Sequence, residues 1–100
     1  MSKGSLALAN WLNKNGFTQV DLARDCGVAQ PRLSAYLSGR TPALGAAVAI
    51  EKATKGEVTV EMWAQPASKT ETSRLEIARE RIRQRGLDRA MEGRGLGASK

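Results

Sequence analysis

The sequence of 100 residues predicts an all-α protein, a compact bundle of four to five short helices followed by a C-terminal helical extension. Apolar residues recur at the 3.6-residue helical period in several short segments rather than in the alternating pattern of strands. Residues 70–93 form one long segment of strong helix formers, with Glu and Arg three or four positions apart. The short segments are followed by glycine, which commonly ends helices: Gly16, Gly27, Gly39 and Gly56.

The first two helices are predicted at residues 5–14 and 19–26. In the first, Leu8 and Leu12 lie on one helical face and form an apolar stripe. The second begins after Thr18, a good N-cap residue, and its first turn contains an aspartate, where a carboxylate interacts favourably with the helix dipole. Two short amphipathic helices separated by a brief turn therefore open the chain.

A third helix is predicted at residues 30–38 and a fourth directly after it. Pro31 lies in the first turn of the third helix, where its missing N–H removes no helix hydrogen bond. Thr41 and Pro42 have the sequence of an N-cap and first helical residue, so we expect the fourth helix to start there and to end before Gly56.

The rest of the chain contains a short ambiguous segment, a linker and a long helix. Residues 57–64 alternate as a strand would, but Thr59 can cap one short helical turn, which is the structure we expect. Residues 65–69 contain proline and small polar residues and have the composition of a linker. We expect the long helix to follow, and the glycine-rich end from residue 93 to be flexible.

Composition favours a DNA-binding or RNA-binding protein over an enzyme. The formal net charge is +6 and the pI is about 10.1, which points to a polyanionic partner. The chain divides into a predicted domain at residues 1–65, with 7 Lys/Arg against 5 Asp/Glu, and a linker, basic helix and tail at residues 66–100, with 9 against 5. The excess of positive charge is therefore concentrated in the second part.

The sequence lacks the side chains that most catalytic and metal-binding sites require. It has no histidine and a single cysteine, Cys26, which disfavours zinc sites and nucleophile-base systems, so we expect no enzyme activity, metal or cofactor. Cys26 lies among apolar residues and is expected to pack as a small hydrophobic side chain. No apolar run is long enough for a membrane span or signal peptide, and we expect a cytoplasmic protein.

The second and third helices have the pattern of a helix-turn-helix. Leu33, Tyr36 and Leu37 share one face of the third helix, and small or polar side chains occupy the other. Ala23 allows the two helices to cross closely, and Gly27 suits a turn that a Cβ atom would strain. The outward face then presents short side chains that fit a major groove about 12 Å wide.

The stretch around these helices resembles the Cro and repressor class of phage-type helix-turn-helix domains. The following segment, GRTPALGAAVAIEKATKGEVTVEMW, is similar to the same part of small Cro-like and YdaS-like regulators. The resemblance covers about residues 5–64 and does not reach the basic tail. The matching residues are Thr18, Gln19, Leu22, Ala23, Gly27, Val28, Gln30, Pro31, Leu33, Ser34, Leu37, Gly39 and Arg40.

This resemblance implies a transcriptional regulator, a repressor of phage, prophage or plasmid type, that binds double-stranded operator DNA as a homodimer. A glutamine amide at position 30 can bond bidentately to adenine. Ala29 departs from the family pattern, since a capping Ser or Thr is common there. Carried onto this sequence, the family's base contacts fall on Gln30, Pro31, Ser34 and Ala35, and its phosphate contacts on Thr18, Gln19, Arg32, Ser38 and Arg40.

The basic helix leaves several interpretations open. Its arginines can belong to a solvated, charge-paired helix or to an arm that follows the phosphate backbone. The narrow apolar stripe of Leu75, Ala78 and Ile82 can pair with a second copy, and residues 70–91 can bind a protein partner, as in an antitoxin-like module. A membrane-surface helix is disfavoured because the stripe is narrow and contains no aromatic residue.

Overall fold

The computed structural model describes the backbone of residues 2–98 and the side chains of residues 2–89. The helical content confirms the predicted all-α class. The described chain forms, in order, α1 (Lys3–Asn15), α2 (Gln19–Cys26), α3 (Gln30–Leu37), α4 (Leu44–Ala53), the short 3-10 helix η1 (Val60–Ala64) and α5 (Lys69–Ala98).

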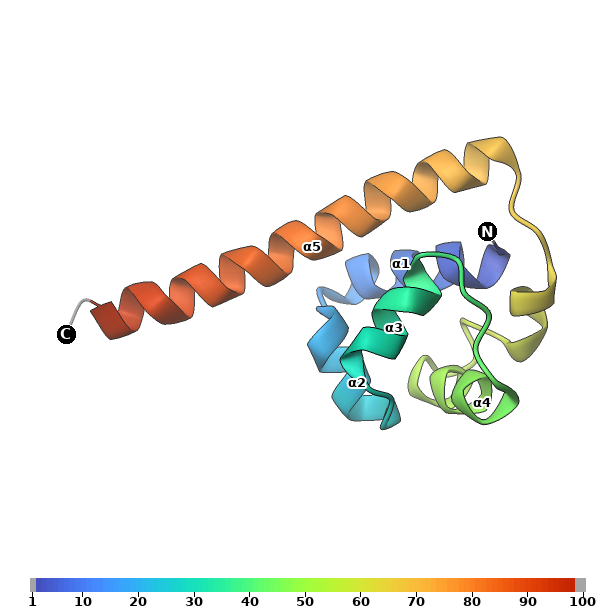
Figure 1. The fold of residues 1–100 in the computed structure, drawn as a ribbon, viewed down its shortest axis with the longest axis horizontal. Coiled ribbons are helices and arrows are strands. Elements are labelled where there is room, and N and C mark those ends of the chain that lie inside the picture. Colours follow the sequence, from blue (N-terminus) through green and yellow to red (C-terminus); the bar gives the residue numbers. More distant parts are fainter. Residues whose placement is uncertain (1, 99–100) are drawn as a thin grey trace.

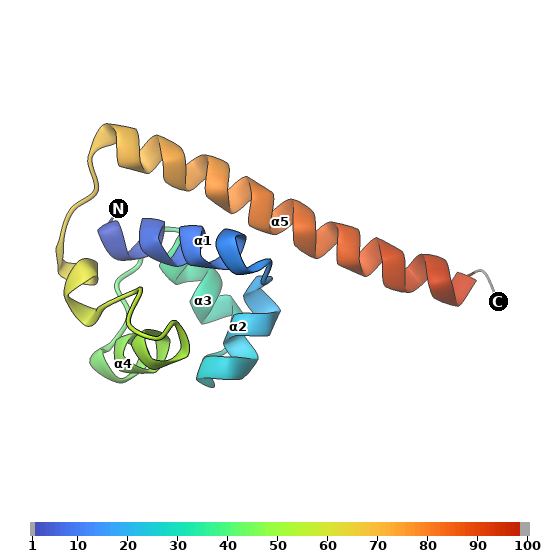
Figure 2. The same cartoon turned by 180° about the vertical axis from the view of Figure 1, so that it is seen from behind.

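Helix α1 lies at the centre of the fold (Figures 1 and 2). It packs against α5 on one side and against α3 and η1 on others, and α2 in turn packs against α3 and α4. The second half of α5 extends past the other helices (Figure 1). Although α5 has 30 residues, no helix among residues 2–98 is both long and apolar enough to cross a membrane.

Caps set the bounds of the first two helices; α2 has the predicted range, whereas α1 begins two residues before the predicted start at residue 5 and ends one residue later than predicted. The Ser2 hydroxyl accepts a hydrogen bond from the N–H of Ser5 at 3.3 Å, and α1 ends at Gly16, whose φ is +67°. A reciprocal capping box opens α2: the Thr18 hydroxyl accepts from the N–H of Asp21 at 3.3 Å, and the Asp21 carboxylate accepts from the N–H of Thr18 at 2.9 Å. These bonds satisfy N–H groups that helix starts leave open.

Two predicted boundaries were wrong, and one ambiguous segment has the structure we expected. Helix α4 begins at Leu44, not at Thr41 and Pro42, because Pro42 is buried in an irregular connection and the helix starts only after it. Residues 57–64 form the expected short turn, η1, and not a strand. Helix α5 continues to Ala98 and so includes most of the segment from residue 93 that we expected to be flexible. No proline interrupts its backbone hydrogen bonds there. Residues 99–100 of that end lie outside the described chain.

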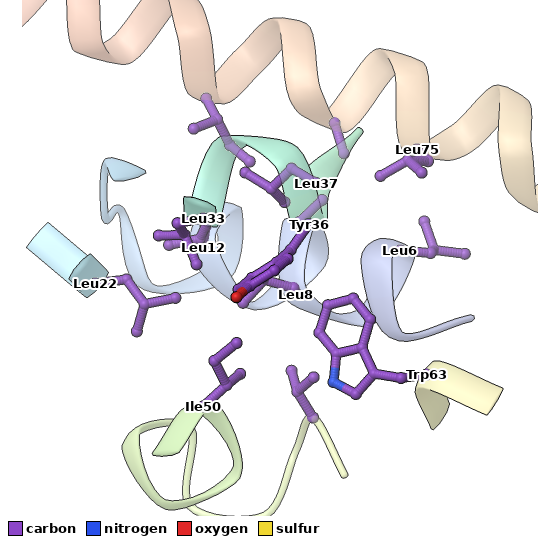
Figure 3. Packing of buried hydrophobic residues seen from close by; sticks show 14 of the residues in the cluster. Leu6, Leu8, Leu12, Leu22, Leu33, Tyr36, Leu37, Ile50, Trp63 and Leu75 are labelled. Atoms are coloured by element: carbon purple, nitrogen blue, oxygen red, sulfur yellow. The ribbon is translucent and has the colours of Figure 1, made fainter. Parts of the chain in front are cut away.

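One hydrophobic core includes residues from α1 to α5 (Figure 3). Leu8 and Leu12 of α1 lie at its centre and are 0% exposed. Leu75, Ala78 and Ile82 of α5 are buried in the same core, against α1. The interpretation that these three pair with a second copy is therefore wrong, because their own chain already covers them.

Hydrogen bonds from α5 to the end of α1 fix the position of the long helix. Arg85 donates to the carbonyl oxygen of Phe17 at 2.9 Å and to the Asn13 side chain at 3.2 Å. Arg89 donates to the carbonyl oxygen of Gly16 at 3.0 Å and forms an ion pair with Asp21. The N–H of Thr18 lowers the pKa of the Asp21 carboxyl, and Arg89 lowers it further. These two arginines therefore stabilise the position of α5 against the end of α1 and the start of α2.

Helix α3 begins after Ala29, which offers no capping side chain. Ala29 is exposed and has an extended backbone (φ −62°, ψ 138°), a conformation that suits an N-cap. We expect Ala29→Ser to change the free energy of unfolding by no more than about 0.5 kcal/mol, because Pro31 has no N–H and the N–H of Arg32 already donates to the carbonyl oxygen of Ala29 at 3.0 Å. Urea denaturation of both proteins measures this change. Thr18→Ala, which removes an existing cap, should lower the free energy of unfolding by about 1 kcal/mol, and an Ala29→Ser protein stabilised by that amount would contradict the prediction.

Candidate nucleic-acid interface

Helices α2 and α3 form the predicted helix-turn-helix and expose one side of α3. The turn passes through Gly27, with φ of +69°, and closes with a hydrogen bond of 3.2 Å from the N–H of Val28 to the carbonyl oxygen of Ala23. Leu33 and Tyr36 attach α3 to the core. The residues on its other side, here called the outer face of α3, are exposed or half-buried: Gln30, Pro31, Arg32, Ser34 and Ala35.

Two glutamine side chains meet at the start of the outer face. The Gln30 amide donates a hydrogen bond to the amide oxygen of Gln19 at 3.0 Å, although the two are 11 residues apart in the sequence. Gln30 keeps its own amide oxygen and a second N–H. This contact therefore orients the Gln30 amide and leaves one donor and one acceptor on it, the pair of groups that a bidentate contact with an adenine requires.

The two flanks of α3 are both hollowed. On one flank lies a groove of about 570 Å³, the α3–α5 groove, formed by Gln19, Gln30 and Ser34 on one wall and by α5 on the other. On the opposite flank a hollow of about 370 Å³ is lined by six residues. These are Pro31, Arg32, Ala35, Tyr36, Arg40 and Thr41. The structure thus divides the predicted base and phosphate contacts between two sides of one helix.

Two of the predicted phosphate contacts are already engaged within the chain. Thr18 is only 8% exposed and its hydroxyl oxygen caps α2, so this oxygen is already used within the fold. Ser38 is exposed, but its hydroxyl donates to the carbonyl oxygen of Ser34 at 3.1 Å and accepts from Arg79 at 3.0 Å. Arg32 and Arg40 are exposed on the flank away from α5.

Two arginines of α5, a helix that the sequence offered as a possible phosphate-binding arm without placing it at this site, also face the outer face of α3. Arg79 and Arg83 line the α3–α5 groove, one helical turn apart. Their four-residue spacing places both on one side of the helix. That spacing was visible in the sequence, but it does not reveal which side of α5 faces α3.

Comparison with protein families assigns the first half of the chain to a known family. The model of a helix-turn-helix family, one of DNA-binding regulatory domains, matches residues 8–59, just over half of the chain. Comparison with curated proteins finds no match, and comparison with solved structures finds none either. The matched segment contains α2, α3 and α4 and stops before α5. The chain therefore belongs to the Cro/repressor-type helix-turn-helix family, and it is a DNA-binding transcription regulator.

Proposed function

We propose that this protein is a sequence-specific repressor of phage, prophage or plasmid type that binds operator DNA as a homodimer, with α3 in the major groove. The observation that carries the proposal is the oriented Gln30 amide at the exposed start of α3. An α-helix with its side chains is about 10–12 Å across, close to the major-groove width of about 12 Å. Ser34, one turn after Gln30 on the outer face of α3, has a short side chain that leaves the Gln30 amide free to reach the base edges.

The base contacts in this proposal come from residues of different reach. Gln30 bonds to adenine through its remaining N–H and its amide oxygen. Ser34 supplies one hydroxyl, whereas Pro31 and Ala35 contribute apolar contact, for which the thymine methyl group is the natural partner. With so few polar groups, part of the specificity depends on the shape and flexibility of the duplex.

The backbone contacts flank this surface. Arg32 and Arg40 lie on the flank away from α5, where they can neutralise phosphates of one strand. Gln19, at the start of α2, lies on the other flank and holds Gln30 at the same time. A phosphate contact by Gln19 would therefore link the register of the protein on the backbone to the orientation of the base-contacting amide.

Dimeric binding and repression complete the proposal. One short recognition helix contacts only a few base pairs, so two copies on a symmetric operator provide the affinity that a regulator needs. The half-sites should then lie about 10 base pairs apart, or a multiple of that distance. A protein bound at such a site excludes polymerase from an overlapping promoter. A small DNA-binding domain is sufficient for this form of repression.

Removal of the Gln30 amide tests the proposal. The operator is first obtained by selecting bound duplexes from random DNA, which also reports half-site spacing. We expect Gln30→Ala to weaken operator binding by about 1–3 kcal/mol, or roughly 5-fold to 150-fold, and to relax the preference at one base pair. Fluorescence anisotropy at fixed salt measures the affinity. Gln65→Ala, an exposed glutamine on the loop before α5, is the matched control and should bind as the wild type does.

Two outcomes would contradict the proposal. One is a wild-type protein that shows no preference among random duplexes at moderate salt. The other is a stoichiometric protein partner bound through residues 70–91, together with DNA binding that Gln30→Ala leaves unaltered, which would support the antitoxin-like alternative. Sedimentation of the protein with one operator duplex gives the number of copies bound, and a single copy would contradict the dimer.

A further inference from the structure

We propose that α5 forms a second wall of the DNA-binding surface, and that Arg79 and Arg83 bind phosphates of a DNA strand lying in the α3–α5 groove. This inference rests on the proposed function of α3. The segment that matches the helix-turn-helix family ends at residue 59, so these two arginines lie outside it.

The dimensions of DNA place one strand on each side of α3. Because the helix nearly fills the width of a major groove, the two sugar-phosphate strands pass close to its two flanks. On one flank, Arg32 and Arg40 can bind one strand. On the other flank the second strand would meet the α3–α5 groove, whose volume is about 570 Å³.

Helix α5 lies beside α3 and lines one of its flanks. Arg79 donates to the Ser38 hydroxyl, at the end of α3, at 3.0 Å. From there α5 runs along the groove, which also contains Ser34 and, at the start of α3, Gln30. Arg83 lies one turn after Arg79 in this groove. The two arginines are thus arranged along the flank where the strand would run.

The donors of these two arginines are largely unused within the described chain. A guanidinium group carries five N–H donors, and the bond to Ser38 uses one of those of Arg79. Arg83 is exposed, and among residues 2–89 it forms no ion pair. Arg85 and Arg89 differ, since both bond to the end of α1. These four arginines of α5 therefore form two pairs, one that holds the helix in place and one that faces the groove.

Two carboxylates line the same groove and limit its attraction for DNA. Glu76 and Glu80 lie on the α5 wall together with the two arginines, so these four side chains carry no net charge. A DNA strand in the groove is attracted by the two arginines and repelled by the two glutamates. Neutralising one glutamate should therefore tighten binding, while neutralising one arginine should weaken it.

The test compares single substitutions on two sides of α5. Anisotropy titrations of the selected operator, from about 50 to 200 mM NaCl, give the slope of log affinity against log salt. We expect Arg83→Gln to weaken binding and to reduce this slope by about 0.9, so that its loss of affinity over this range is about 3.5-fold smaller than that of the wild type. Arg81→Gln is the matched control, because Arg81 lies in a separate hollow beside Arg85 and Gln84. Glu80→Gln should bind more tightly than the wild type.

The outcomes separate this inference from the proposed function. An Arg83→Gln protein with the same slope as Arg81→Gln, in a protein that still prefers its operator, overturns the phosphate role of α5 alone. An increase in affinity for Arg83→Gln also overturns it and would mean that α5 covers α3 rather than extending its surface. A wild-type protein without operator preference overturns both ideas. Thermal melts of each variant check the fold, which an exposed side chain should not change.

Discussion

Replacing Ile82 by alanine should lower the free energy of unfolding by about 2–5 kcal/mol, a large part of the total for a domain of this size. The Ile82 side chain is 1% exposed and packs with Leu75 of α5 into the same core as α1. The substitution removes three buried carbon atoms and leaves a cavity that the surrounding helices fill only in part. Equilibrium denaturation in urea, followed by circular dichroism, measures the loss.

An exposed isoleucine on the same helix provides the control. Ile77 is 58% exposed, so Ile77→Ala changes the same side chain with little loss of packing and should alter stability by less than about 0.5 kcal/mol. Equal effects at the two positions would contradict the packing of α5 on α1. If Ile82→Ala is strongly destabilising, deletion of residues 68–100 would disturb the whole fold. Point substitutions are then the better test of what α5 does on DNA.

Replacing Gly4 by alanine should also destabilise the protein, by about 1–3 kcal/mol, although alanine is normally the better helix residue. Gly4 lies in the first turn of α1 and is covered by the indole ring of Trp63. A Cβ atom added to Gly4 would lie 2.6 Å from Cε3 of that ring, well inside van der Waals contact. Trp63 is 4% exposed and has an edge contact with Tyr36 at 6.2 Å between ring centroids. The indole therefore has little room to move.

Two comparisons isolate this clash. Gly45 lies in the first turn of α4, where an added Cβ atom would meet nothing within 4 Å, so Gly45→Ala should be neutral or stabilising by up to about 1 kcal/mol. In a Trp63→Leu background, Gly4→Ala should lose most of its effect, because a smaller side chain leaves space for the methyl group. A double-mutant cycle from thermal or urea unfolding measures that coupling. Additive effects would contradict the contact.

Several elements were predictable because their causes are local. Thr18 caps α2, Gly27 turns the chain in the left-handed conformation, and α3 begins one residue before Pro31. Each signal acts over a few residues, and the period of apolar residues identifies the buried side of each helix. The start of α4 was not predictable in this way, since the burial of Pro42 competes with its use as the first residue of a helix.

The sequence by itself determined the helices, the helix-turn-helix and the outward position of Gln30, because caps, turns and helical periods act between near neighbours. Only the tertiary structure decided where α5 lies. Its stripe of three apolar residues fits α1, a second copy or a partner equally well by pattern alone. The bonds from Arg85 to Phe17 and Asn13 join residues about 70 positions apart and fix one of these choices. That choice turns Arg79 and Arg83 towards α3 and makes them part of the candidate DNA-binding surface.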